Sequence, residues 1–138
     1  MKPSEYYSRA ITREVNLLDV ADPHLIPKGS VDVDEQMQRC GTNKNGYAIL
    51  KQQVAARLNK KRKEYAEAYL AENVALTEAA LEALGSTKSQ KDKIIKARLA
   101  GIQFEIDEAE SMFRFFQDGD DTMTEWCQIY KKIREVPR

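Results

Sequence analysis

The chain has 138 residues, with 22 basic residues balanced by 22 acidic ones, 42% hydrophobic residues, six glycines and four prolines. This length predicts one domain, and few Gly and Pro beside abundant Ala, Glu, Lys and Leu predict a helical one. No stretch reaches the roughly 20 apolar residues of a membrane span, so we expect no membrane partner. Two cysteines, Cys40 and Cys127, are too few for a disulfide framework and indicate free thiols in a reducing cytoplasm.

A short helix is predicted near the start of the chain. Ser4 is a suitable N-cap residue, and apolar side chains recur at helical spacing from Tyr7 to Leu18. Pro23 is expected to end the helix, because the residue before a proline avoids helical backbone angles. The pattern predicts an amphipathic helix over about 5–20.

The next segment, residues 21–46, is expected to be an irregular arm. It contains two prolines and three glycines, a composition typical of loops, with a brief extended run at 30–34. So long a structureless segment inside a compact domain would be unusual. We therefore expect residues 1–46 to form a short helix plus an arm that binds a protein partner or a neighbouring subunit, and residues 47–138 to form the rest of a single domain.

Two long helices are predicted after the arm. Residues 47–84 lack Gly and Pro, and Gly85 is suited to the left-handed cap that ends a helix. Thr87 and Gln90 have the spacing of a capping box for the second helix. That helix has a heptad pattern, which requires a packed helical partner. The heptad residues are Ile95, Leu99, Ile102, Ile106, Ala109, Phe113 and Phe116.

The first helix carries a matching but weaker apolar stripe. Its members are Leu50, Val54, Leu58, Tyr65, Tyr69, Leu76 and Ala80. Beyond the second helix, the polar run at 118–121 is expected to interrupt the chain. Thr122 and Glu125 then have capping-box spacing for a short third helix that carries Trp126.

Charge is arranged in blocks along the two long helices. Residues 51–63 carry six basic residues and no acidic one, whereas 64–85 carry five glutamates and nothing basic. Folding the chain back at 85–89 brings unlike blocks together, and a parallel pairing would oppose like charges. The sequence therefore predicts an all-α fold, a long antiparallel coiled-coil-like hairpin with an irregular N-terminal arm and a short C-terminal helix.

Apolar side chains also lie outside the two stripes. Phe104 and Phe115 widen the apolar face of the second helix, and Leu70 and Val74 that of the first. A two-helix hairpin cannot cover so many faces alone, so we expect a homo-oligomer. The residues expected to carry packing and assembly are Ile95, Leu99, Ile102, Ile106, Phe113, Phe116 and Trp126.

The sequence contains no motif for catalysis or for a cofactor. It has no Gly-rich phosphate loop, no Cys-x-x-Cys and no His-Glu-x-x-His. Acidic residues cluster at 32–35 and 118–121, where carboxylates can bind Mg²⁺ or Ca²⁺, but solvated turn residues are the commoner use of such clusters. We expect no enzyme activity, no cofactor and no metal.

One segment has the composition of a binding surface. The basic belt consists of Arg57, Lys60, Lys61, Arg62 and Lys63 and surrounds a helix on all sides. Repeated in an oligomer, it would bind phosphates by releasing counterions, with Tyr65 and Tyr69 stacking on unpaired bases. The alternative is that the belt neutralises the acidic helix opposite it and that both tyrosines are core residues.

The segment from Lys91 to Val136 has a recognisable layout. It reads Lys-Asp-Lys-Ile-Ile-Lys-Ala, an aromatic-rich amphipathic helix, a polar break and a Trp-containing helix that ends in Lys-Lys-Ile-Arg. With the long helix before it, this layout resembles the recombination-mediator proteins of T4-type phages, the UvsY family. The resemblance implies a ring-forming phage protein that loads a recombinase onto single-stranded DNA, with Lys60, Lys61, Arg62 and Lys63 as DNA-binding residues. Small terminase subunits are a second resemblance.

Two functions follow from these features. The first is a non-enzymatic, oligomeric nucleic-acid accessory protein of the recombination-mediator type, which binds single-stranded DNA through the basic belt in the (host) cytoplasm. The second is a structural or adaptor protein, a virion, packaging or assembly component that oligomerises through the hairpin and binds a partner through residues 21–46. The basic block modestly exceeds what its opposing helix neutralises, which favours the first.

Overall fold

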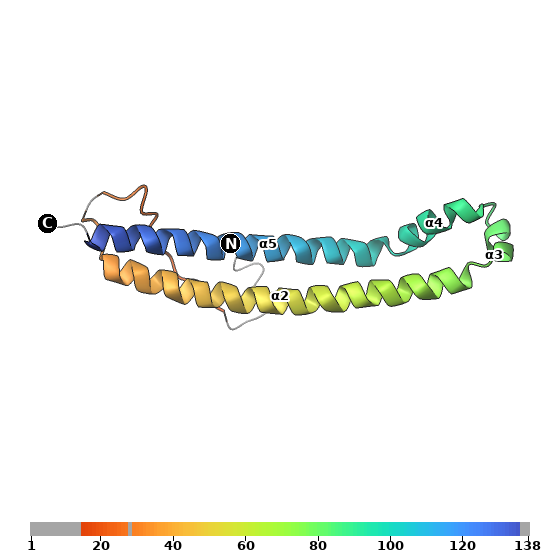
Figure 1. Ribbon diagram of the computed structural model, residues 1–138, viewed down its shortest axis with the longest axis horizontal. Coiled ribbons are helices and arrows are strands. Elements are labelled where there is room, and N and C mark those ends of the chain that lie inside the picture. The colour runs from red at the N-terminus through yellow and green to blue at the C-terminus, as the bar shows by residue number, and fades with distance from the viewer. Residues whose placement is uncertain (1–14, 28, 136–138) are drawn as a thin grey trace. The chain divides into compact units, whose positions relative to one another are not determined.

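The computed structural model describes residues 15–27 and 29–135, which contain helices and connecting segments but no strand. The long helices α2 (Val33–Ala75) and α5 (Ala100–Glu135) pack antiparallel, as the heptad and charge patterns predict. Between them come α3 (Glu78–Ala83), the 3-10 turn η1 (Lys88–Gln90) and α4 (Lys91–Arg98) (Figure 1). The fold is therefore an all-α antiparallel helical hairpin.

The hairpin divides into two compact units. Of the described residues, 15–27, 29–54 and 112–135 belong to unit 1, and 55–111 belong to unit 2. In unit 1 the first part of α2 packs on the last part of α5, and the irregular segment before α2 lies against them. In unit 2 the remainder of α2 packs on α3, α4 and the first part of α5.

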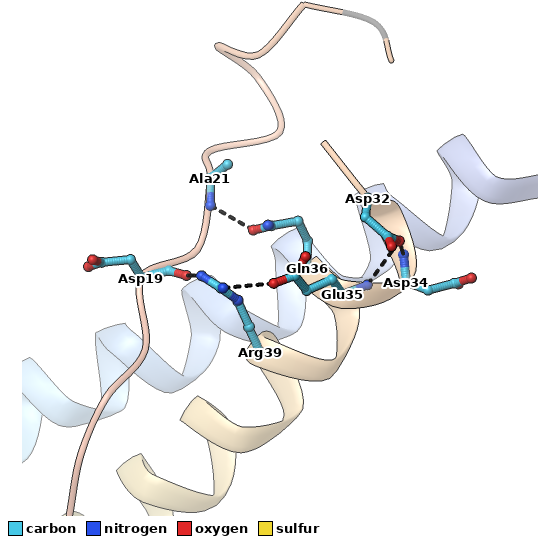
Figure 2. A network of polar contacts seen from close by, with 7 residues as sticks. All are labelled: Asp19, Ala21, Asp32, Asp34, Glu35, Gln36 and Arg39. Carbon is cyan, nitrogen blue, oxygen red and sulfur yellow. Dashed lines mark hydrogen bonds and ion pairs between the residues drawn. The ribbon is translucent and has the colours of Figure 1, made fainter. Parts of the chain in front are cut away.

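Helix α2 begins at Val33 and not at residue 47. Asp32 is its N-cap, because its Oδ1 accepts hydrogen bonds from the backbone N–H groups of Asp34 (3.0 Å) and Glu35 (3.3 Å) (Figure 2). Asp34 and Glu35 also place negative charge in the first turn, where the helix dipole favours it. The predicted irregular arm is therefore wrong from residue 33 onwards, and the extended run predicted at 30–34 leads into this cap instead.

Tertiary packing explains why this segment is helical despite Gly41 and Gly46. Cys40, Asn43 and Leu50 are buried and recur at the spacing of one helix face. A glycine inside a helix costs about 0.5–1 kcal/mol relative to alanine. Burying one large apolar side chain such as that of Leu50 contributes about 1.5–3 kcal/mol, so packing outweighs the local preference for a loop.

The irregular segment before α2 consists of residues 15–27 and 29–32. Its backbone groups form hydrogen bonds with side chains of α2. Leu18 donates its backbone N–H to Asn43 Oδ1 (2.7 Å), and its carbonyl accepts from Asn43 Nδ2 (2.8 Å). The helix predicted over 5–20 is wrong for residues 15–20, which are irregular, and the rest of it lies outside the described residues. A side chain from α2 therefore satisfies backbone groups that a local helix would otherwise have satisfied.

Two further contacts fix this segment to α2. Gln36 Oε1 accepts from the backbone N–H of Ala21 (2.9 Å), and Arg39 Nη1 donates to the carbonyl of Asp19 (2.9 Å) (Figure 2). Arg39 is itself held by Glu35, at 2.7 Å. The predicted arm is thus bound by its own chain over these residues.

In unit 2, α2 ends at Ala75, before the predicted end at residue 84. Thr77 then caps the short helix α3, with its side chain accepting a hydrogen bond from the N–H of Ala80 (3.3 Å). A threonine in extended conformation favours a helix start, so the chain changes direction here without glycine or proline.

Helix α3 ends at the glycine cap predicted by the sequence. Gly85 has a φ of +68°, and its N–H bonds to the carbonyl of Glu82 (2.9 Å). The N–H of Ser86 bonds to the carbonyl of Leu81 (2.9 Å), which completes a Schellman motif. The predicted left-handed cap at Gly85 is confirmed, although it ends α3 and not one uninterrupted helix.

The second predicted helix is α4 and α5 together. Gln90 Oε1 accepts from the backbone N–H of Thr87 (3.0 Å), which is the reciprocal bond of the predicted capping box. Leu99 separates the two helices. Helical bonding nevertheless continues across the junction, because Leu99 N–H bonds to Ile95 O and Gln103 N–H bonds to Leu99 O, each at 3.0 Å.

Helix α5 continues through residues 118–121, so the predicted break and the separate third helix from Thr122 are wrong. Gly119 faces the ring of Tyr47, and a Cβ atom at this position would overlap that ring. Thr124 donates its hydroxyl to the carbonyl of Asp120 (3.1 Å), as mid-helix threonines do. The glycine serves close helix packing, and the aspartates lie within the helix.

Candidate interaction surfaces

The heptad residues form the inside of the hairpin. Ile95, Leu99, Ile106 and Phe116 are buried at 0–7% exposure. Ile102, Phe113 and Trp126 are half-buried. In unit 2, buried Ile95 and Leu99 join Leu76 and Leu81 in one apolar cluster, against which Tyr65 and Tyr69 pack. This stripe is therefore used for contacts within one chain.

Unit 1 has a second cluster, around Cys40, Met123 and Tyr130, against which Trp126 and Cys127 pack. Both cysteines are free thiols. Burial, and to a smaller extent the nearby Cys127, raises the pKa of the Cys40 thiol. Cys40 is therefore an unreactive core side chain.

Ion pairs across the hairpin follow the predicted charge blocks. In unit 1, Lys51 Nζ lies 2.7 Å from Asp120 Oδ2. In unit 2, Arg98 Nη1 lies 2.8 Å from Glu72 Oε2, and Lys88 pairs more loosely with Glu78 at 3.4 Å. Unlike blocks thus face each other within each unit, which supports the antiparallel register.

Two residues of the basic belt form ion pairs with glutamates of α5 in the same chain. Lys61 Nζ lies 2.9 Å from Glu105 Oε2 and 3.2 Å from Glu64 Oε2, and Arg62 Nη2 lies 2.8 Å from Glu110 Oε1. The hydrogen bond to Glu105 raises the pKa of Lys61, and the same bond lowers the pKa of Glu105. These two cations neutralise the acidic helix opposite them.

The remaining belt residues are less constrained. Lys63 is 77% exposed and lies 3.9 Å from Glu67 on the same helix. Lys60 is exposed, and no ion pair is seen for it among the described residues. Arg57 is half-buried and helps to lower the pKa of Glu105 through its charge. The belt therefore consists of an inner pair, Lys61 and Arg62, which form ion pairs with α5, and an outer pair, Lys60 and Lys63, which are exposed. Arg57 is intermediate in exposure.

The two tyrosines beside the belt contact each other. The rings of Tyr65 and Tyr69 stack with centroids 6.4 Å apart, and both pack against the apolar cluster of unit 2. The hydroxyl of Tyr69 donates to Asp92 Oδ1 at 2.5 Å, which raises the pKa of Tyr69 and lowers that of Asp92. Both rings are half-buried. This favours the prediction that the two tyrosines are core residues over the prediction that they stack on unpaired bases.

The two acidic clusters are occupied by structural contacts. Asp32 caps α2, and Asp34 lies 3.3 Å from Arg134. In the other cluster Asp120 binds Lys51, and Asp121 accepts from Gln117 at 2.9 Å. Within the described ranges, no group of three or more His, Cys, Asp or Glu side chains is placed to hold a metal ion.

Several large apolar side chains of unit 2 face solvent. Leu70, Val74 and Phe104 are 64%, 71% and 67% exposed, and Leu84 is 53% exposed. Beside Phe104 the surface has an open hollow of about 520 Å³. It is lined by Tyr65, Lys96, Ala100, Gln103, Phe104 and Asp107.

Sequence reasoning missed the polar side chains that hold the irregular segment. Asn43 and Gln36 are 3% and 8% exposed and bind the backbone of Leu18 and Ala21. Their spacing with Cys40 and Leu50 along one helix face was the signal available in the sequence.

Comparison with known proteins gives no match to any family model, curated protein or solved structure. Among the described helices, none is both long enough and apolar enough to cross a membrane. The function is therefore inferred from the surfaces of the hairpin.

Proposed function

We propose that this protein is a non-enzymatic structural or adaptor protein that assembles with copies of itself. The observation that carries this proposal is the exposure of Leu70, Val74 and Phe104 in unit 2, each above 60%. These side chains lie outside the hairpin's own core, and covering them in an assembly would remove apolar surface from water.

The ion pairs of the basic belt also support an assembly function over a nucleic-acid function. Lys61 and Arg62 lie within 3 Å of Glu105 and Glu110, respectively. A phosphate would have to compete with carboxylates already in place, and a released carboxylate would repel the phosphate backbone. The belt thus has fewer free cations than its sequence indicates.

Sedimentation equilibrium of the full chain over a wide concentration range tests the proposal. The chain mass is 15.8 kDa, and we expect a concentration-dependent mass of at least twice that value. A constant monomer mass up to the highest soluble concentration would contradict self-assembly. Raising the salt concentration should not abolish an association that rests mainly on apolar contacts.

Single-stranded nucleic-acid binding is the second candidate function, and the outer pair of the belt favours it. Lys60 and Lys63 are exposed, and the pair between Lys63 and Glu67 is loose at 3.9 Å. A Lys60→Ala/Lys63→Ala variant should then bind an oligo-dT strand more weakly, with a log–log salt slope that is shallower by about 0.7 for each phosphate that is no longer neutralised. Lys131→Ala/Lys132→Ala, at two exposed lysines outside the belt, is the matched control and should bind like the wild type. No binding by the wild-type protein at low salt would end this candidate.

A further inference from the structure

The surface of α4 and α5 that faces away from the hairpin core has a regular composition. Six exposed residues recur there at spacings of one, three and four, which places them on one side of the helix because hydrogen bonding continues through Leu99. We call this surface the α4–α5 face. Its residues are Lys93, Ala97, Ala100, Gly101, Phe104 and Glu108.

The middle of the α4–α5 face combines a projecting ring with open space. Phe104 is 67% exposed, and the hollow of about 520 Å³ that Ala100 helps to line lies directly beside it. A Cβ atom added at Gly101 would have no atom within 4 Å. Phe104 therefore projects beside the small residues of the face, and the hollow opens along one edge of the face.

The ends of the α4–α5 face carry opposite charges. Lys93 lies one turn before Ala97, and Glu108 lies one turn after Phe104. For Lys93 and Glu108, no ion pair is seen within the described part of the chain, whereas the neighbouring Lys96 is held by Asp92 at 3.0 Å. Along the chain, the α4–α5 face therefore begins with a basic residue, continues with small residues and an aromatic ring, and ends with an acidic residue.

This order is complementary to itself when one copy is reversed. In an antiparallel pair centred between Ala100 and Gly101, Lys93 of each copy lies opposite Glu108 of the other. The same register places Phe104 opposite Ala97, so each ring lies over small residues of the second copy. A parallel pair would instead oppose Lys93 to Lys93 and Glu108 to Glu108.

We propose that the α4–α5 face is the contact through which two copies of this chain form an antiparallel dimer with two-fold symmetry. The inference rests on the proposed self-assembly and specifies the surface that carries it. Each interaction occurs twice, because a two-fold interface uses the same patch on both subunits. Two rings are buried and two ion pairs form in one dimer.

Charge reversal on the full chain, followed by sedimentation equilibrium, tests the orientation of the pair. Lys93→Glu alone and Glu108→Lys alone should each raise the dimer dissociation constant about threefold to tenfold, since each creates two like-charge contacts. The double variant Lys93→Glu/Glu108→Lys should restore the wild-type value. An equimolar mixture of the two single variants should also associate like wild type, because all four charges then face opposite charges.

The central ring is tested by Phe104→Glu, which should raise the dissociation constant by about tenfold or more. Ile49→Glu is the control, since Ile49 is an exposed apolar residue of α2 in unit 1 and lies outside the α4–α5 face. Circular dichroism should be unchanged in every variant, because all the altered side chains are exposed.

The three ways in which the proposal can fail are distinguishable. A wild-type protein that stays monomeric overturns the proposed self-assembly and this contact together. A wild-type oligomer that tolerates Phe104→Glu, or that only Ile49→Glu disrupts, overturns the α4–α5 face and leaves self-assembly standing. Charge reversals without recovery in the double variant would contradict the antiparallel register.

Discussion

The ring of Tyr47 on α2 lies directly against Gly119 on α5, in the place that a side chain at residue 119 would occupy. Tyr47 also contacts Phe116, with ring centroids 6.3 Å apart, and burial raises the pKa of its hydroxyl. The glycine therefore allows two helices of unit 1 to approach closely around an aromatic side chain.

Replacing Gly119 with alanine should destabilise the protein by about 1–3 kcal/mol, because the added methyl group forces the Tyr47 ring to move. Elsewhere in a helix the same change usually stabilises by about 0.5–1 kcal/mol. Gly41→Ala is the control, since a Cβ there meets nothing within 4 Å, and it should stabilise. Urea unfolding of both variants measures the difference. Stabilisation by Gly119→Ala would show that the ring is not confined.

The hairpin could be predicted because its signals are long and repeated. The heptad from Ile95 to Phe116 and the alternating charge blocks both favour one antiparallel arrangement, and the observed pairs Lys51–Asp120 and Glu72–Arg98 fall close to that register. Local features such as the Gly85 cap could also be predicted, because they depend on the conformation of a few adjacent residues.

The start of α2 and the continuity of α5 could not be predicted from local composition. Glycine and asparagine are loop-forming on their own, yet Asn43 and Gly119 serve contacts with residues distant in the sequence. Such tertiary contacts override propensities of less than about 1 kcal/mol per residue. Which residues of the basic belt form ion pairs could not be predicted either, because this depends on the positions of Glu105 and Glu110 in the folded hairpin.

Breaking the Lys51–Asp120 pair should be costly, because both side chains are less than one-fifth exposed and Lys51 also donates to Gln117 at 3.1 Å. Lys51→Met leaves the carboxylate without its cation and should destabilise unit 1 by about 1–3 kcal/mol, measured by urea unfolding. The double variant Lys51→Met/Asp120→Leu should recover part of that loss, since it removes both charges. Lys63→Met, at an exposed pair, is the control and should change stability by less than about 0.5 kcal/mol.

Asn43→Ala should release the irregular segment from α2. The change removes both hydrogen bonds to the backbone of Leu18 and leaves a partly buried N–H and carbonyl unpaired, at a cost of about 1–3 kcal/mol. Amide hydrogen exchange at Leu18 should become much faster. Asn45→Ala, at an exposed neighbouring position, should leave that exchange rate unchanged. Equal effects of the two variants would contradict the anchoring role of Asn43.

The Tyr69–Asp92 hydrogen bond should make the stability of unit 2 depend on acid pH. The bond from Tyr69, followed by that from Lys96, lowers the pKa of Asp92 below its unfolded value of about 3.9. Its contribution is therefore fully present above about pH 4 and is lost as the pH falls through the lower folded value.

Tyr69→Phe should reduce this acid sensitivity, because the ring remains while the hydroxyl that holds the carboxylate is removed. The measurement is the difference in the free energy of unfolding by urea between pH 5 and pH 3, which should be smaller in the variant than in the wild type. Tyr65→Phe is the matched control, since its ring stacks on Tyr69 and its hydroxyl has no bond to Asp92 within the described residues. It should keep the wild-type difference. An unchanged difference in Tyr69→Phe would mean that Asp92 is held by Lys96 without the tyrosine.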